Sequence, residues 1–148
     1  MQIKKLTESE TAEALRLVWD VFMKFVAPDY CEKGINIFKS FIDNEKSISG
    51  LAIYGAFDEE KIVGVAATRN EGNHIALFFV NSNYHRRDIG RKLFETVLQN
   101  STSDHITVNS SPCAAEVYRH LGFADTDTEQ LKNGMRYTPM LYIKYAAV

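Results

Sequence analysis

A basic loop ahead of an amphipathic helix carries the strongest chemical signal in this 148-residue chain. The helix is predicted over about residues 88–99, because apolar side chains recur there at the 3.6-residue period. A helix start already presents unpaired N–H groups and about half a positive charge, so cations are unfavourable there unless an anion binds. Such a loop is typical of a phosphate site, and a solvated basic turn is the alternative. The side chains concerned are His85, Arg86, Arg87, Arg91 and Lys92.

A second polar segment follows a short predicted strand at residues 105–108. Asn109 opens a turn, and Pro112 suits the first turn of a helix predicted over about residues 112–120. Gly122 then stands at the C′ position, where glycine commonly ends a helix. The segment therefore predicts a strand, a turn and a short helix in close succession.

Together, the two segments resemble the GNAT acetyltransferase superfamily. The family's cofactor motif, Gln/Arg-x-x-Gly-x-Gly/Ala, falls on His85-Arg86-Arg87-Asp88-Ile89-Gly90. Its later motif of Asn, Ala, Tyr and Gly-Phe is matched by Asn109, Ala114, Tyr118, Gly122 and Phe123. The order of elements is similar through the whole chain, and the motif-level similarity covers residues 74–123. The resemblance implies an α/β fold with a mixed, mostly antiparallel central sheet, helices on both faces and strands splayed at the cofactor cleft.

Asp88 departs from the family pattern, which has its first glycine at this position. A carboxylate there would repel a pyrophosphate by up to about 4 kcal/mol at about 4 Å in a partly solvated site. Aspartate is also a favoured N-cap, so its side chain can occupy the N–H groups that a phosphate needs. Arg91 and Lys92 follow at the spacing that lets them pair with Asp88 and draw it aside. The prediction is a site that still binds coenzyme A, more weakly than relatives with glycine.

The resemblance implies acetyl-CoA as the acetyl donor. Its pantetheine arm would pair with backbone groups late in the strand predicted over residues 75–80, and its pyrophosphate would lie in the basic loop. Asn109 would bond the pantetheine or, equally, support its own turn. The cofactor-binding residues expected on this basis are Phe79, Val80, His85, Arg86, Arg87, Asp88, Ile89, Gly90, Arg91 and Asn109. No metal site is expected.

The implied reaction moves an acetyl group to a primary amine by direct attack in a ternary complex. An amine must be neutral to attack, so a base or a chain of waters has to remove its proton. Glu71, His74 and Tyr54 are candidates for that base by residue type only. Tyr118 matches the family's tyrosine and is expected to protonate the departing thiolate; a packed aromatic is the alternative. A backbone N–H of the splayed strand is expected to stabilise the oxyanion.

The acceptor amine is not identified by the sequence. In the family, the segment between the first two helices, here residues 26–34, and the last hairpin shape the acceptor pocket. Trp19, Phe22 and Tyr30 offer an aromatic wall, with ordinary core packing as the alternative. The acidic run at residues 125–129 would attract a cationic amine, or is a solvated turn. A small molecule and a peptide N-terminus both remain open.

The remaining elements form one predicted α/β domain over residues 1–148. A first strand ends at Thr7, which with Glu10 forms a capping box for the first helix. A second helix is predicted near residues 32–44, and a hairpin over residues 50–69. The apolar run before the basic loop is typical of a strand covered on both faces. Residues 136–145 are predicted to close the sheet as its last strand.

Composition favours a cytoplasmic enzyme. The net charge of −2 gives no reason to expect a nucleic-acid binder, and no apolar run reaches the ~20 residues that span a bilayer. The N-terminus lacks the apolar core of a signal peptide, and the two cysteines, Cys31 and Cys113, lack a metal-ligand spacing. A homodimer is possible, as in many family members. A catalytically inactive GNAT-like module that binds coenzyme A or protein partners is the alternative function, which Asp88 favours.

Overall fold

The computed structural model describes residues 1–85 and 88–144. Its strands are β1 (Gln2–Lys5), β2 (Ala52–Asp58), β3 (Lys61–Arg69), β4 (His74–Val80), β5 (His105–Ser110), β6 (Ala124–Asp125), β7 (Gln130–Lys132) and β8 (Met135–Ile143). Its α-helices are α1 (Thr11–Phe25), α2 (Glu32–Asp43), α3 (Glu45–Ser49), α4 (Ile89–Asn100) and α5 (Ala115–Leu121). Short 3-10 turns are η1 (Glu8–Glu10), η2 (Ala27–Asp29), η3 (Ser82–Tyr84) and η4 (Pro112–Ala114).

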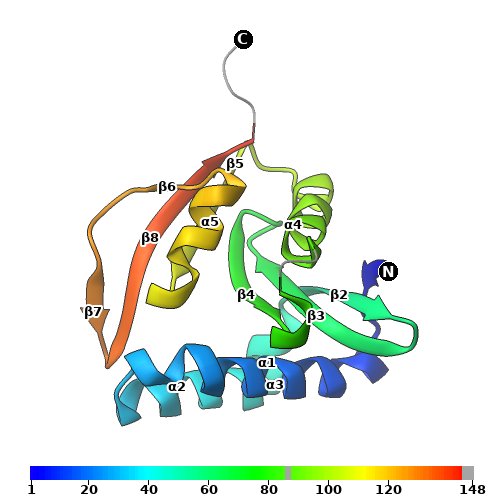
Figure 1. Cartoon of the computed structure of the whole chain (residues 1–148), viewed down its shortest axis with the longest axis horizontal. Helices are drawn as coiled ribbons and strands as arrows, with labels where there is room; N and C mark the ends of the chain where they lie inside the picture. The colour runs from blue at the N-terminus through cyan, green and yellow to red at the C-terminus, as the bar shows by residue number, and fades with distance from the viewer. Residues whose placement is uncertain (86–87, 145–148) are drawn as a thin grey trace.

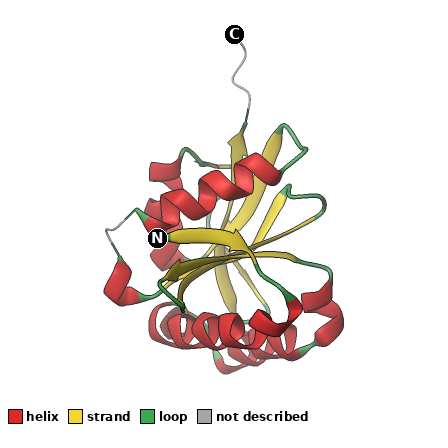
Figure 2. Cartoon of the chain, turned by 90° about the vertical axis from the view of Figure 1, so that its right-hand side faces the viewer, coloured by secondary structure: helices red, strands yellow, loops and turns green. Residues whose placement is uncertain are grey.

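One sheet runs through the molecule in the order β1-β2-β3-β4-β5-β8-β6, with β7 pairing to β8. Its strand pairs are antiparallel except for β4 with β5, which are parallel. Helices α1 to α3 form a layer on one side, and α4 and α5 lie on the other (Figures 1 and 2). This confirms the predicted fold class. The last strand does not close the sheet, however, because β6 pairs with its outer edge.

Two apolar cores lie on opposite faces of the sheet. On the α4/α5 face, strand residues such as Ile75 and Ile106 pack with Leu93 of α4 and Tyr118 of α5. On the α1/α2 face, Leu77 and its neighbours pack with the first three helices. Successive strand residues point to opposite faces, so buried residues along one strand serve both cores. The buried central strands therefore form a rigid base for whatever lies at their ends.

Local signals set the helix ends as the sequence predicts. The Thr7 N–H donates to Glu10 Oε1 over 2.9 Å, which completes the capping box ahead of α1. Gly122 ends α5 with φ of 112°, in the left-handed region that glycine adopts without strain. Helix α3 was not predicted; Asn44 begins it by accepting hydrogen bonds from two backbone N–H groups.

Candidate active site

Strands β4 and β5 part soon after they meet. Their parallel register contains two pairs, His74 with Thr107 and Ile75 with Val108. Just beyond, the β3–β4 register passes from Thr68–Ile75 to Ala67–Leu77, which leaves Ala76 without a partner on β3. An extra residue of this kind is a β-bulge, which bends a strand and is common beside active sites. The splay, meaning the part of β4 beyond Ile75 and of β5 beyond Val108, therefore begins at a bulge.

The backbone of β4 offers hydrogen-bonding groups to the splay. The Asn81 N–H donates to the Val63 carbonyl over 2.9 Å, so Val80 opposite Gly64 belongs to a non-hydrogen-bonded pair. In an antiparallel ladder such pairs alternate, so Phe78 and Val80 direct their N–H and C=O groups away from β3. Phe79 directs its groups toward β3 instead. The outward backbone groups of β4 in the splay are therefore those of Phe78 and Val80, whereas the sequence-based expectation names Phe79 and Val80.

Asp88 begins helix α4 in the left-handed conformation, with φ of 61°. This explains why a glycine suits the position, since side chains rarely adopt that conformation. Its carboxylate makes no cap hydrogen bond, so the first N–H groups of α4 stay free for an anion, contrary to one expectation from its residue type. The expected ion pair of Asp88 with Arg91 or Lys92 is not among the ion pairs of the described residues.

The other expected loop residues differ in how far their side chains are exposed. Arg91 and Lys92 are exposed, whereas the Ile89 side chain is buried in the core, so Ile89 can offer an anion only its N–H. A Cβ atom on Gly90 would lie 3.6 Å from the Phe78 ring, so this helix start packs directly on the splayed strand. Arg86 and Arg87 lie outside the described residues.

His85 and Lys24 join the loop to helix α1. The His85 ring lies against Phe25 with centroids 5.5 Å apart, and its Nε2 contacts the Val80 carbonyl at 2.9 Å. That contact occupies one of the outward groups of β4. Lys24 Nζ donates to Ser82 Oγ over 3.0 Å, which brings a further cation to the loop. No sequence signal marked Lys24, because 58 residues separate it from Ser82.

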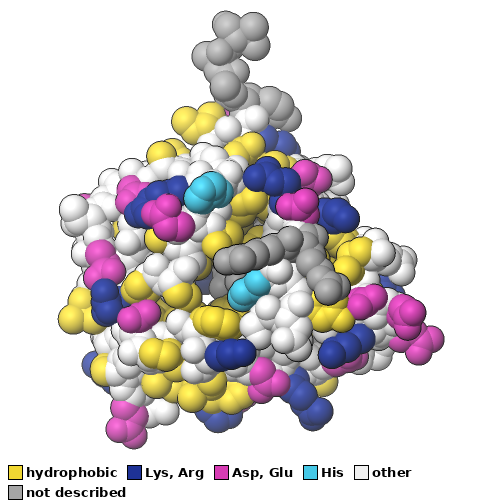
Figure 3. Space-filling model, viewed as in Figure 1, with side chains coloured by type: hydrophobic (Ala, Val, Ile, Leu, Met, Phe, Trp, Pro, Cys, Tyr) yellow, Lys and Arg dark blue, Asp and Glu magenta, His cyan; other side chains and the backbone are white. Residues whose placement is uncertain are grey.

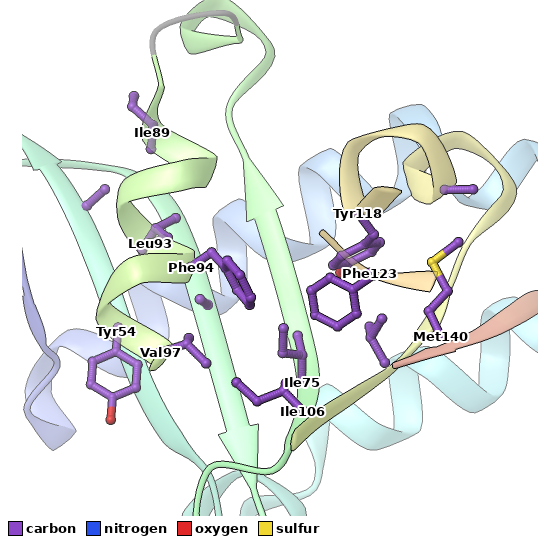
Figure 4. Packing of buried hydrophobic residues seen from close by; sticks show 14 of the residues in the cluster. Tyr54, Ile75, Ile89, Leu93, Phe94, Val97, Ile106, Tyr118, Phe123 and Met140 are labelled. Carbon is purple, nitrogen blue, oxygen red and sulfur yellow. The ribbon is translucent and has the colours of Figure 1, made fainter. Parts of the chain in front are cut away.

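Tyr118 fills the splay on the α4/α5 face. Its ring centroid lies 5.7 Å from that of Phe78 on β4. The ring also packs against Phe123, with centroids 5.4 Å apart (Figure 4). Burial, with a smaller contribution from nearby Cys113, raises the pKa of Tyr118 well above its ordinary value. The Tyr118 hydroxyl makes no hydrogen bond within the described part of the chain. Every fully buried side-chain oxygen in that part does have a hydrogen-bond partner. The hydroxyl oxygen therefore reaches the accessible surface, although the residue is only 5% exposed.

Of the three candidate bases, His74 alone lies next to the splay, in the residue pair with Thr107 that precedes it. Its Nδ1 contacts Thr107 Oγ1 at 2.8 Å, and burial together with the charge of Arg69 lowers the pKa of His74 to about 4. Glu71 is exposed in the β3–β4 turn. Tyr54 is buried on β2, which β3 separates from β4.

Asn109 lies on the α1/α2 face of β5. Thr107 and Asn109 alternate along this strand with Val108 and Ser110, which are buried. Asn109 is therefore exposed on the face of His74, opposite Tyr118. This position suits contact with an arm between the parted strands or with an acceptor.

The segment 26–34 and the hairpin of β7 and β8 are in contact. Arg136 Nη1 pairs with Asp29 Oδ1 at 3.2 Å, and the Cys31 N–H donates to the Gly134 carbonyl over 3.0 Å. Arg136 also pairs with Glu129, and Arg119 pairs with Asp125. Two carboxylates of the acidic run are thus matched by arginines, which weakens their attraction for a cationic amine.

Aromatic side chains cluster beneath this segment. Phe22 stacks on Phe38 with centroids 3.9 Å apart and meets the edge of Tyr30 at 5.5 Å. Trp19 stacks on Phe22 at 5.6 Å. Phe22 is fully buried, as ordinary core packing predicts, whereas Tyr30 and Trp19 are partly exposed. Tyr30 is therefore the member best placed to contact an acceptor.

The residues present fit coenzyme A. The free edge of β4 can receive an extended arm, and the uncapped N-terminus of α4 can receive a phosphate. Within residues 1–85 and 88–144, no cluster of His, Cys, Asp or Glu is arranged to hold a metal ion. In the same residues, no helix combines the length and apolarity needed to cross a membrane.

Comparisons with known proteins agree with this geometry. A GCN5-related N-acetyltransferase from Rhodopseudomonas palustris superposes with a TM-score of 0.81 at 22% identity, over 96% of this chain and 94% of its own. The PaiA N-acetyltransferase of Thermoplasma acidophilum, solved with coenzyme A, superposes with a TM-score of 0.72 at 16% identity, over 96% of this chain and 98% of its own. The ribosomal-protein-S18-alanine N-acetyltransferase of Escherichia coli superposes with a TM-score of 0.65 at 17% identity, over 99% of this chain and 96% of its own.

At these sequence identities the structural similarity establishes a shared fold, but it does not establish a shared substrate. No match was found among the sequences of curated proteins. The profile of the acetyltransferase (GNAT) domain, however, matches residues 26–144, which is most of the chain. The chain therefore belongs to the GNAT acetyltransferase family.

Proposed function

We propose that the protein is an acetyl-CoA-dependent N-acetyltransferase that moves an acetyl group to a primary amine by direct attack in a ternary complex. The observation that carries this proposal is the parting of β4 and β5 after two residue pairs, directly between a tyrosine and an uncapped helix start. Coenzyme A bound to two proteins of this fold supports it. The bound thioester would supply an activated acetyl group.

The chain's own residues would hold this donor at three places. The N–H groups of Ile89, Gly90 and Arg91, with the side chains of Arg86, Arg87 and Arg91, would bind the pyrophosphate. Lys24 lies close enough to the loop to add a cation. Backbone groups of Phe78 and Val80 would pair with the arm, and His85 would release the Val80 carbonyl if the arm needs it. Asn109 would contact the arm from β5.

The net reaction is balanced without any further reactant. An N–C bond forms, the C–S bond breaks with its electron pair on sulfur, and the proton lost by nitrogen ends on sulfur. Tyr118 is the residue proposed to donate a hydrogen bond and then a proton to that sulfur. Its raised pKa keeps the phenol protonated at neutral pH, so the donor is always available. The free backbone of β4 near the bulge at Ala76 is proposed to stabilise the oxyanion.

The acceptor is proposed to be a small molecule or a peptide with a primary amine. Proteins of this fold include enzymes named for an aminoglycoside and for a ribosomal-protein alanine, so the fold accommodates both classes. A cytoplasmic location and a homodimer are proposed as well. Sedimentation analysis of the purified protein tests the dimer directly.

An inactive GNAT-like module is the second candidate, and the exposed carboxylate of Asp88 is the observation that favours it. Nucleic-acid binding has less support. On the face shown in Figure 3, Lys and Arg side chains are interspersed with Asp and Glu in the described part, rather than gathered in one basic stripe. Steep salt dependence in filter binding would favour nucleic acid; saturable acetyl-CoA binding would favour the enzyme.

Calorimetric titration with acetyl-CoA is the first test. We expect saturable binding that the variant Arg87→Ala weakens strongly. With binding in hand, initial rates at several concentrations of both substrates should give intersecting reciprocal plots, and Cys113→Ser should remain active. Parallel plots with an inactive Cys113→Ser would indicate an acetyl-cysteine route in place of direct attack. No acetyl-CoA binding would make the inactive module the leading function.

A further inference from the structure

We propose that His74 Nε2 is the group that accepts the proton from the acceptor amine. This inference rests on the proposed function and adds the base that the sequence left open. Its support comes from three features of the molecule: a hydrogen-bond chain that fixes the imidazole tautomer, the face of the sheet on which the ring lies, and the open surface beside it.

The hydrogen-bond chain starts at the Asn73 carbonyl. Thr107 Oγ1 donates to that carbonyl over 3.2 Å, and the same oxygen lies 2.8 Å from His74 Nδ1. The hydroxyl has one proton, so both contacts are hydrogen bonds only if His74 donates through Nδ1–H. A neutral ring with its proton on Nδ1 has its lone pair on Nε2. No partner of Nε2 occurs in the described residues, and no buried side-chain nitrogen there is unsatisfied, so Nε2 reaches the accessible surface.

His74 and Tyr118 lie on opposite sides of β4. Ile75 packs in the same core as Tyr118, on the α4/α5 face (Figure 4). His74 is the preceding residue of the strand, so its side chain emerges on the α1/α2 face. A proton acceptor on one face and a proton donor on the other suit a reaction in which nitrogen approaches and sulfur departs at the same carbon. The bulge at Ala76 and the start of the splay lie immediately beyond His74.

A hollow lies beside Thr107, the hydrogen-bond partner of His74. Thr107 lines a shallow hollow of about 510 Å3 on the α1/α2 face, together with His105, Thr126 and Leu141. The ring stays neutral through the pH range of ordinary assays, because burial and Arg69 lower the pKa of His74 to about 4. A base this weak suffices once the N–C bond begins to form, since a nitrogen being acylated is far more acidic than a free ammonium. His74 would then pass the proton to water, and Tyr118 would regain a proton from water after its phenol has protonated the departing sulfur.

The kinetic test uses methylamine, the smallest primary amine, at high concentration with saturating acetyl-CoA, and follows thiol release above the uncatalysed rate. In His74→Asn the side-chain amide can still donate to Thr107 where Nδ1 did, but nothing replaces Nε2. We expect this variant to lower kcat about 100-fold while the Kd for acetyl-CoA stays within about twofold. His120→Asn is the control, because His120 is an exposed histidine of α5 outside both the splay and this hollow, and the variant should keep full activity.

A second readout needs no turnover. Two-bond 1H–15N correlation spectra of the 15N-labelled protein distinguish the two ring nitrogens of each histidine. We expect His74 to show a protonated Nδ1 and a bare Nε2, unchanged between about pH 5.5 and pH 8. Thr107→Val removes the partner of Nδ1, so we expect a mixture of tautomers and a kcat lowered about threefold to tenfold.

Full activity in His74→Asn would overturn the inference, because only the Thr107 contact would then matter. A protonated Nε2 in the spectra would overturn it as well. The inference would also be overturned if acetyl-CoA binds to the protein but reacts with methylamine no faster than free acetyl-CoA does. That result would leave the proposed cofactor site standing. Failure to bind acetyl-CoA at all would instead overturn the proposed function on which the inference rests.

Discussion

At the scale of single residues, burial decides which groups of the site are charged. Tyr118 packs among Phe78 and Phe123, and its pKa is raised, so it remains a neutral hydrogen-bond donor. His74 is partly buried beside a cation and its pKa is lowered, so it remains a neutral acceptor. Both shifts follow from the same cost of placing charge in a poorly solvated place. The two side chains are thereby kept in the protonation states that the proposed reaction needs.

Replacing Tyr118 by phenylalanine removes the hydroxyl and keeps the ring contacts. We expect kcat to fall about 100-fold with the acetyl-CoA Kd nearly unchanged, since the hydroxyl is proposed to act on the departing sulfur and not to hold the donor. Tyr142→Phe is the matched control, because Tyr142 packs in the same core against Phe94 and Phe123. Equal turnover in Tyr118→Phe and the wild type would remove Tyr118 from the mechanism.

His74 also makes stability depend on pH. The unfolded chain takes up a proton at this residue below about pH 6.5, whereas the folded protein does so only near pH 4. The contribution of the neutral ring is therefore complete above pH 6.5 and is lost as the pH falls toward 4. After allowance for solvent screening it amounts to about 1–2 kcal/mol. Urea unfolding of the wild type and His74→Asn should show their free-energy difference change by this amount between pH 7.5 and pH 4.5. A constant difference would contradict the lowered pKa.

At the scale of elements, the start of α4 combines a good geometry with an unfavourable charge. The helix places its first N–H groups beside the splay, and Asp88 adopts a left-handed conformation that a glycine adopts more easily. The side chain does not cap the helix, so its repulsion of phosphate is the remaining cost. Backbone strain and charge can be separated by substitution.

Asp88→Gly should relieve both effects, whereas Asp88→Asn should relieve only the charge. We expect both variants to bind acetyl-CoA about 3- to 10-fold more tightly by calorimetry, and only the glycine variant to gain stability, by about 0.5–1 kcal/mol. Glu59→Gly is the control for backbone strain, because Glu59 has φ of 57° in the distant β2–β3 turn. It should gain stability without a change in affinity. No affinity gain in either Asp88 variant would show that the aspartate is no defect.

At the scale of the whole molecule, ligand binding should stabilise the single sheet as a unit. The splay joins β4, held by α1 and α4, to β5 and β8, so a ligand across it bridges both halves of the sheet. At 100 times its Kd, a ligand that binds only the folded state contributes about 2.7 kcal/mol. For a chain of this size we expect acetyl-CoA to raise Tm by about 5–10 °C, measured by calorimetry. Double-stranded DNA added at equal mass should leave Tm unchanged. A Tm raised by DNA and not by acetyl-CoA would favour nucleic-acid binding.

The sequence by itself determined the order of the main elements other than α3, β6 and β7, the capping residues at several helix ends and the residues of the two motifs. These depend on apolar periodicity, capping side chains and turn glycines, which act within a few residues. Only the tertiary structure decided which groups meet. His74 reaches Thr107 across 33 residues and Lys24 reaches Ser82 across 58, and the strand register selects Phe78 over Phe79 for the free edge. Register changes by one residue reverse the direction of every backbone and side-chain group, and long-range pairing, which leaves little local trace in a sequence, sets that register.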